Sequence, residues 1–268
     1  MVREKGSYDF GGFKDKRREL EILERQSLAA IDLERSIWRN AGLEDGMKVL
    51  DLGCGPGFTS CEIARTARKG LVLGIDGSWE LVLEAQKTAR RRKLKNVSFI
   101  QGDACRLRLP DNSFDFVHAR LLFQHLEHPG KALGNIRRIL KPGGKVCITD
   151  IDDRWLKLHP EPRPLRKLLE GTYRIQKRAG GDRHVGGKLG GMLYDAGFSS
   201  ISTGIHLLTS REIGLKGLLD IAIGFRAGLF PSHGKNEADA MIREIYSLLD
   251  KPEAGGWCGI FAAAGRKA

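Results

Sequence analysis

Residues 48–57 read KVLDLGCGPG, and this short stretch decides the fold. An apolar run broken only by Asp51 is typical of a strand that is buried on both faces, as strands of parallel sheets are. The three glycines that follow let the backbone turn sharply and approach a ligand, because glycine has no Cβ. A helix is expected from this turn to about residue 69. The stretch therefore predicts the first strand, turn and helix of an α/β sheet.

The same alternation of short apolar runs and helical stretches continues along the chain. Further strands are predicted at 71–75, 97–100, 114–118, 145–149, 199–208 and 257–265. Strands that alternate with helices predict a doubly wound architecture, in which each crossover places a helix on a face of the sheet. We therefore expect an α/β fold with a seven-stranded, mostly parallel sheet and helices on both faces.

Two helical regions are expected to flank the sheet domain, which is assigned to residues 46–210 and 251–268. Residues 1–45 are charged and have helical periodicity, which predicts an N-terminal helical cap or lid. Residues 211–250 form an amphipathic helical insertion that we expect to cover the substrate, because long excursions from compact domains are usually functional. Its apolar residues either line a hydrophobic pocket or form the core of the cover: Ile213, Leu215, Leu218, Leu219, Ile221, Ile223 and Phe225.

The residues that end the predicted strands indicate which ligand the sheet binds. A dinucleotide fingerprint, G-x-G-x-x-G, would require a glycine where this chain has Phe58, so a nicotinamide cofactor is not favoured. Asp76 ends the second strand about 20 residues after the glycine turn, where a carboxylate can accept both hydroxyls of a ribose. Asp51 is expected to accept a hydrogen bond from a cationic ligand. The pattern therefore favours an adenosine-containing ligand.

Residues 49–57 resemble the first motif of the class I S-adenosylmethionine-dependent methyltransferases, and the resemblance extends over residues 45–150. It implies methyl transfer as the activity and S-adenosyl-L-methionine as the cofactor. Carried over residue by residue, it implies that Gly53, Cys54 and Gly55 line the methionine part of the cofactor. Asp76 would bind the ribose, beside the turn formed by Gly77 and Ser78.

The resemblance also covers the ends of the third and fourth strands. Asp103 would meet the adenine amino group, and the backbone of Ala104 would meet the adenine ring. The backbone at Arg120 would hold the methionine amino group. Towards the N-terminus, Tyr8 and Gln26 resemble the lid of small-molecule methyltransferases related to the ubiquinone and menaquinone group. In the alternative interpretation, these two side chains only pack against or solvate a helix.

Catalysis of methyl transfer relies largely on alignment, because the departing group is already activated. If a base is needed, His125 is our candidate, since histidine titrates near neutral pH and this segment follows the fourth strand. The alternative is a structural histidine at a helix start. Asp150, Asp152 and Asp153 follow the fifth strand, and carboxylates are ligands that magnesium prefers. The preferred interpretation is a solvated loop, and no metal is expected.

Composition bounds the partners only loosely. The net charge is +12, and residues 154–188 hold ten Lys or Arg against three acids, which is typical either of a solvated surface or of an anion-binding one. We expect a methyltransferase that acts on a small or lipid-like molecule. The alternatives are an RNA-modifying methyltransferase that uses the basic surface and a non-catalytic cofactor-binding protein. Five scattered cysteines without a C-x-x-C pair, and no apolar run long enough to span a membrane, predict a cytoplasmic protein.

Overall fold

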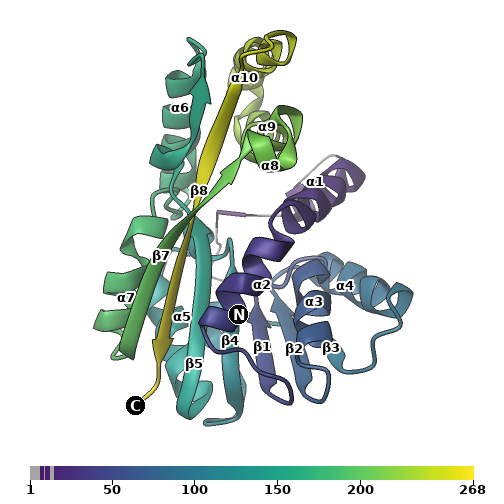
Figure 1. Ribbon diagram of the computed structural model, residues 1–268, viewed down its shortest axis with the longest axis vertical. Coiled ribbons are helices and arrows are strands. Elements are labelled where there is room, and N and C mark those ends of the chain that lie inside the picture. Colours follow the sequence, from purple (N-terminus) through teal and green to yellow (C-terminus); the bar gives the residue numbers. More distant parts are fainter. Residues whose placement is uncertain (1–6, 9, 13–14) are drawn as a thin grey trace.

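The computed structural model describes residues 7, 8, 10–12 and 15–268. Its centre is a sheet with the strand order β3-β2-β1-β4-β5-β8, and two further strands, β6 and β7, pair with β8 (Figure 1). β1 to β5 run parallel, and β8 is antiparallel to its partners. The predicted doubly wound α/β fold is confirmed. The strands are β1 (Lys48–Leu52), β2 (Leu71–Asp76), β3 (Val97–Gln101), β4 (Phe114–Arg120), β5 (Leu140–Ile151), β6 (Lys157–His159), β7 (Ser199–Thr209) and β8 (Gly255–Arg266).

The described residues form eight strands, one more than the sequence predicts. The additional strand is β6, which has three residues and places Lys157 opposite Trp257 of β8. It extends the line of β5 along β8, after the short 3-10 turn Asp153–Trp155. A three-residue segment has too few positions for alternation to be recognised. Only its pairing with the distant β8 makes it a strand.

Helices cover both faces of the sheet, as expected. On one face, α5 (Pro129–Ile139) and α7 (Leu189–Asp195) pack against apolar side chains of β4, β5 and β8. On the other face lie α2 (Ile31–Asn40), α3 (Phe58–Thr66) and α4 (Trp79–Arg91), whose buried residues form two smaller clusters with β1, β2 and β3. Figure 1 shows the two sets on opposite sides of the strands. The central strands β1 and β4 are therefore buried on both faces, which fits their mostly apolar sequences.

A second layer of helices lies beyond the carboxyl ends of the parallel strands. The long strands β7 and β8 extend past these ends towards it (Figure 1). It contains α6 (Leu165–Arg178), α8 (Ser210–Ile213), α9 (Leu215–Ala222) and α10 (Ser232–Tyr246). These helices have a hydrophobic cluster of their own, in which Leu168 of α6 meets residues of α9 and α10. We call residues 156–178 and 210–250 the cover. It is larger than the expected insertion, because α6 packs with the cover and not with the core of the sheet.

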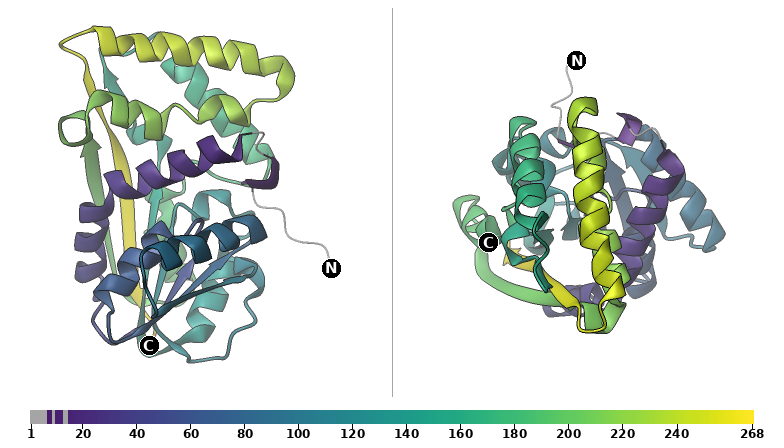
Figure 2. Two further views of the ribbon diagram at one scale, coloured as in Figure 1. Left: turned by 90° about the vertical axis from the view of Figure 1, so that its right-hand side faces the viewer. Right: turned by 90° about the horizontal axis from the view of Figure 1, so that it is seen from above.

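The expected N-terminal cap divides into two helices with different neighbours. α1 (Lys16–Ala29) lies between the sheet domain and the cover, as Figure 2 shows in its left view. α2 instead buries Ile37 and Trp38 against the sheet. α1 also contacts the cover directly, because Arg25 forms an ion pair with Asp220 of α9 at 3.0 Å. The N-terminal segment therefore connects the two layers.

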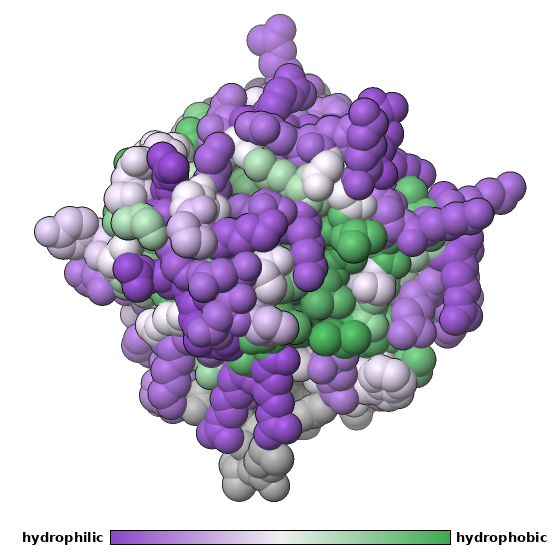
Figure 3. All heavy atoms as spheres, turned by 90° about the horizontal axis from the view of Figure 1, so that it is seen from below, coloured by the Kyte–Doolittle hydropathy of each residue, from purple (hydrophilic) through white to green (hydrophobic). Residues whose placement is uncertain are grey.

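The surface at the amino ends of the parallel strands faces away from the cover. Figure 3 shows it from below: polar side chains surround a smaller apolar area. Leu71, at the start of β2, is 61% exposed.

Among the helices of the described residues, none combines the length and the apolar character that crossing a membrane requires.

Candidate active site

One large cavity lies between the carboxyl ends of the parallel strands, α1 and the cover. Its volume is about 1030 Å³. The sequence-predicted site residues all line it, although they come from six separate segments of the chain. These residues are Tyr8, Gln26, Asp51, Gly53, Cys54, Gly55, Asp76, Gly77, Ser78, Asp103, Ala104, Arg120 and His125. The sheet brings them together because carboxyl ends of parallel strands meet at one edge.

The glycine turn after β1 has a backbone conformation that other residues rarely adopt. Gly53, Gly55 and Gly57 have φ angles of 74°, 53° and 78°. A Cβ on Gly57 would lie 2.8 Å from the Cβ of Ala85 and 2.9 Å from the ring of Phe99, so this glycine allows α3 to pack against α4 and β3. A Cβ on Gly55 would meet nothing within 4 Å. The backbone at Gly55 is thus open towards the cavity, where a ligand can approach it.

Asp76 holds the glycine turn and the following turn together. Its Oδ2 accepts a hydrogen bond from Gly55 N at 2.9 Å, and its Oδ1 accepts one from Ser78 N at 2.8 Å. Burial raises the pKa of the carboxyl group, although the two amide donors act in the opposite direction. Each carboxylate oxygen has a second lone pair. Asp76 can therefore position the turn and still accept hydroxyl donors from a ligand.

Asp103 stands at the same edge, after β3. Its Oδ1 accepts a hydrogen bond from Cys105 N at 2.8 Å, which fixes the start of a short 3-10 helix, Ala104–Arg106. Nearby, Gln101 Nε2 donates to Gly77 O at 2.8 Å and ties the end of β3 to the turn after β2. Asp76 and Asp103 thus line one side of the cavity from neighbouring strands.

Asp51 occupies the interior of the sheet more than the cavity. It is 1% exposed, it accepts a hydrogen bond from Ser60 Oγ, and its Oδ1 lies 2.9 Å from His118 Nδ1. His118 also faces Glu34 of α2, and the two carboxylates raise its pKa to about 9 although burial alone would lower it. A protonated His118 is therefore stabilised between two acids. The Asp51 carboxylate thus binds two protein groups, and its predicted contact with a cationic ligand stays a prediction.

Arg120 belongs to the same network and acts through its side chain. Its Nε donates to Glu34 Oε1 at 3.0 Å, and its Nη2 donates to Gln26 O at 2.8 Å. It therefore links β4 to α1 and α2. His118 and Glu34 were not singled out from the sequence, because a buried histidine on a strand and an acid on a charged helix give no local sign of pairing.

The two lid residues come from the N-terminal segment and line the cavity. Tyr8 Oη donates to Glu19 Oε1 at 2.9 Å, and burial is the main reason why the pKa values of both groups are raised. Gln26 Nε2 donates to Ile221 O of the cover at 3.2 Å. Both side chains thus line the cavity and bond to protein groups, and their role as a lid stays a prediction.

His125 faces the cavity beside Tyr8, with ring centroids 5.4 Å apart. Its Nδ1 lies 2.9 Å from Ser7 Oγ and 3.4 Å from Gln176 Nε2. Burial, aided by the positive charge of Arg183, lowers its pKa to about 3. A ring that stays neutral throughout the physiological range is a weak base. With this pKa we expect His125 to act as a neutral hydrogen-bonding group, and the general-base role stays an untested prediction.

Comparison with known proteins bears directly on this cavity. Residues 43–179, just over half of the chain, match the family described as "Methyltransferase domain". This chain belongs to that family. The match includes the glycine turn, Asp76, Asp103 and the strand ends that line the cavity. The class I methyltransferase resemblance drawn from residues 49–57 is thereby confirmed.

The relatives of this methyltransferase domain are only partly similar to it. It is 32% identical to an uncharacterized methyltransferase of Schizosaccharomyces pombe over 59% of this chain and 58% of that protein. It is 33% identical to the ubiquinone/menaquinone biosynthesis C-methyltransferase UbiE of Bdellovibrio bacteriovorus over 42% of this chain and 50% of that protein. The chain spans between 30% and 58% of the length of these and other curated relatives that it matches.

A solved structure extends the similarity to the whole fold. Phosphoethanolamine N-methyltransferase 2 of Haemonchus contortus, in complex with phosphomonomethylethanolamine and S-adenosylhomocysteine, superposes with a TM-score of 0.64. The superposition covers all of this chain and 60% of the other, at 19% identity. At this identity the likeness concerns the fold, so the chemistry has to be argued from the residues of the cavity.

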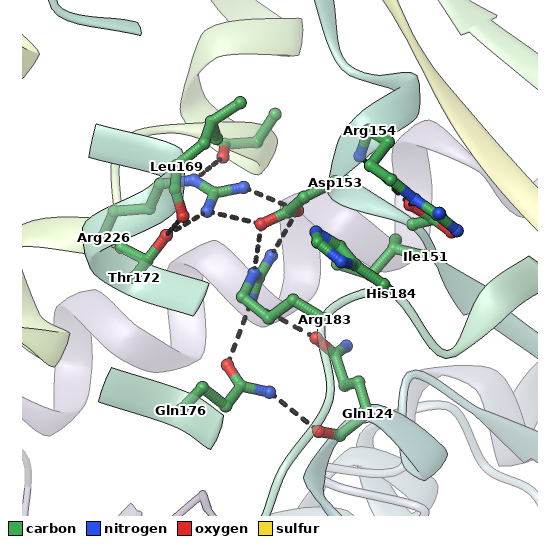
Figure 4. Close-up of polar contacts among 12 residues, drawn as sticks. Gln124, Ile151, Asp153, Arg154, Leu169, Thr172, Gln176, Arg183, His184 and Arg226 are labelled. Carbon is green, nitrogen blue, oxygen red and sulfur yellow. Dashed lines mark hydrogen bonds and ion pairs between the residues drawn. The ribbon is translucent and has the colours of Figure 1, made fainter. Parts of the chain in front are cut away.

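The cavity has a buried ionic cluster at its cover end. The sequence analysis did not predict that these residues pair. Figure 4 shows Asp153 between the guanidinium groups of Arg183 and Arg226. Both arginines donate two hydrogen bonds to this carboxylate. The basic composition of residues 154–188 pointed to a charged region, but Arg226 lies outside it and had no distinguishing signal. The other two acids of the loop have separate partners, Arg154 for Asp152 and backbone amides for Asp150.

Proposed function

We propose that this methyltransferase domain transfers a methyl group from S-adenosylmethionine to a small molecule held between the sheet and the cover. The observation that carries the proposal is a single cavity lined at one end by the glycine turn, Asp76 and Asp103 and at the other by the cover. A volume of about 1030 Å³ is near the upper limit of typical ligand sites, which suits a cofactor and a substrate together.

The residues at the sheet end fit the cofactor. Gly55 has an open side towards the cavity, and Asp76 keeps lone pairs available for the ribose hydroxyls. Asp103 and Ala104 would hold the adenine, and Gly53 with Cys54 would line the methionine part. When bound, S-adenosylmethionine supplies an activated methyl group for in-line displacement. The protein's own contribution is then to orient the two reactants and exclude water.

The lid residues would complete that enclosure. Tyr8 and Gln26 join the N-terminal segment to the cavity wall, and Arg120 anchors α1 to β4. No general base is assigned, since the neutral His125 would serve as a hydrogen-bonding group that orients the acceptor. Alignment is sufficient in principle, because well-oriented reactants gain on the order of 10⁵ M or more in effective concentration.

The lining at the cover end supports an acceptor with an apolar body. Leu156, Leu208, Phe225, Leu229 and Ile260 line this part of the cavity. Two of the seven apolar residues considered from the sequence, Ile221 and Phe225, also line it. The other five belong to the core of the cover: Ile213, Leu215, Leu218, Leu219 and Ile223. The insertion thus contributes both wall and core, and a small or lipid-like acceptor fits the wall.

Ligand-dependent unfolding tests the proposal. S-adenosylmethionine and S-adenosylhomocysteine, each at about 100 times its dissociation constant, should raise the free energy of unfolding by about 2.7 kcal/mol, whereas NAD should not. Conversion of S-adenosylmethionine to S-adenosylhomocysteine should then be measured with a panel of small apolar acceptors and with bulk RNA. A folded protein that neither cofactor stabilises would overturn the proposal. Methyl transfer to RNA alone would instead overturn the small-molecule assignment.

A further inference from the structure

Asp153, Arg183 and Arg226 form a buried cluster whose formal charges do not balance. Their exposed fractions are 6%, 3% and 1%. Asp153 Oδ1 accepts from both Nη2 groups, at 3.0 Å from Arg183 and 2.9 Å from Arg226. Its Oδ2 accepts from Arg183 Nε at 2.5 Å and Arg226 Nη1 at 2.9 Å. Two guanidinium groups thus share a single carboxylate, and one positive charge is left over.

The remaining partners of the two arginines do not supply the missing negative charge. They are the neutral groups Ala222 O and Thr172 Oγ1 for Arg226, and Gln124 Oε1 and Gln176 Oε1 for Arg183. A guanidinium has five N–H groups, and each arginine uses four of them in these bonds. Each therefore keeps one N–H on Nη2 for a further acceptor.

Among the ion pairs of the described residues, the neighbouring acids Asp150 and Asp152 form none with Arg183 or Arg226. Asp152 is paired with Arg154, so that pair has no net charge. Asp150 accepts hydrogen bonds from the amides of Ile151 and Gln124; burial raises its pKa to about 7, although the positive charge of Arg183 acts in the opposite direction. Among the ion pairs of the described residues, Asp153 is the acid partner of both Arg183 and Arg226. An uncompensated buried charge is costly, so a site that keeps one is suited to a ligand of opposite charge.

The cluster faces the space that the acceptor would occupy. Asp153, Arg183 and Arg226 line the same cavity as the glycine turn, and Figure 4 shows them together with Gln176 and Gln124. Phe225 lies against both guanidinium groups, 5.3 Å from each. The remaining Nη2 N–H of each arginine can donate one charge-assisted hydrogen bond, so the two arginines together can bind two oxygens of a carboxylate or phosphate. The excess of one charge matches a single anionic group.

We infer that Arg183 and Arg226 form a subsite for an anionic oxyacid group, a carboxylate or a phosphate, on the molecule that the cavity accepts. The assignment of that molecule as the methyl acceptor rests on the proposed function. With the apolar lining beside the cluster, the acceptor class becomes an amphiphilic acid, whose anionic group binds at the arginines and whose apolar part lies along the cover. Asp153 then holds the two guanidinium groups in place and lowers their mutual repulsion.

Simple anions test this inference without knowledge of the acceptor. Unfolding is followed in sodium acetate and in sodium phosphate, each compared with sodium chloride at equal ionic strength, with and without S-adenosylhomocysteine. The wild type should be stabilised by at least one of the two oxyanions beyond the chloride reference. Whichever of the two binds more tightly identifies the preferred anionic group.

Two variants that change the charge of the cluster in opposite directions distinguish a binding site from a purely structural cluster. Arg226→Met leaves the balanced pair of Asp153 and Arg183, and it should lower oxyanion affinity at least about tenfold. Arg226→Lys retains the charge and should retain most of the response. Asp153→Asn raises the excess charge, so its stability should depend more strongly on oxyanions than that of the wild type. Arg138→Met removes an equal charge outside the cavity and should leave the response unchanged.

The outcomes distinguish this inference from the proposed function. Cofactor binding without any oxyanion response, or an undiminished response in Arg226→Met, would overturn the anionic subsite alone. An oxyanion response in a protein that does not bind S-adenosylhomocysteine would overturn the proposed function and leave the subsite in place. If Asp153→Asn does not fold, the comparison of Arg226→Met with Arg226→Lys still decides the question.

Discussion

Asp76→Asn is the substitution that tests the ribose end of the cavity most directly. It removes the negative charge and replaces one oxygen by an amide NH2, which can no longer accept a hydrogen bond. In the wild type the two oxygens accept from Gly55 N and Ser78 N. One of these amides would then face a donor, at a cost of about 1–3 kcal/mol in stability. The effect on ligand binding must therefore be measured as the increase in the free energy of unfolding that the ligand causes in each variant. We call this increase the increment.

The magnitude follows from the hydrogen bonds that a ribose would make. A hydrogen bond to a charged group contributes about 1.5–3 kcal/mol, so the loss of about 2 kcal/mol weakens cofactor binding roughly 30-fold. A ligand present at 100 times the wild-type dissociation constant is then at only about three times that of the variant. The stabilisation by S-adenosylhomocysteine should fall from about 2.7 to about 0.9 kcal/mol.

Denaturant unfolding with and without S-adenosylhomocysteine gives this increment, and Asp115→Asn is the matched control. Asp115 accepts from Lys48 N at 2.8 Å and from Lys141 Nζ at 2.6 Å, at the amino ends of the strands and outside the cavity. Its variant should lose stability but keep the full increment. An Asp76→Asn protein that keeps the full increment would refute the placement of the ribose. If both variants lost the same part of the increment, the weaker ligand binding would not be due to the contact of Asp76 with the ligand.

Two further predictions concern the histidines of the domain. The pKa of His118 is raised from its ordinary value near 6.5 to about 9 by Asp51 and Glu34, so its contribution to stability is complete below pH 6.5 and is lost as pH rises through 9. Over that range the free energy of unfolding should fall less steeply in His118→Gln than in the wild type, and parallel curves would contradict the network. For His125, a pKa of about 3 means that His125→Gln should lower kcat by less than about 100-fold, the lower end of the effect of losing a general base. Rate measurements between pH 6 and 8 check this, and a larger loss with a changed pH profile would restore the base role.

Much of the fold could be predicted because its signals are local. A buried parallel strand is mostly apolar, and a turn against a ligand needs glycine, so residues 48–57 specify both within ten positions. Once the strands are placed, the positions of Asp76 and Asp103 follow, since Asp76 ends β2, Asp103 follows the end of β3, and the carboxyl ends of parallel strands share one edge. The sequence alone therefore located the edge of the sheet at which the cavity lies.

The cover end could not be predicted, because its contacts join residues that are far apart in the chain. Arg226 reaches Asp153 across 73 positions, and Glu34 reaches Arg120 across 86. α6 packs with the cover only because its apolar face meets those of α9 and α10, and an amphipathic helix does not specify its partner. The same holds for protonation: the pKa of His125 falls and that of His118 rises because of what packing places around each ring. Local pattern determined the sheet and the edge at which the cavity lies, whereas long-range packing alone decided the charges that line the cavity at the cover end.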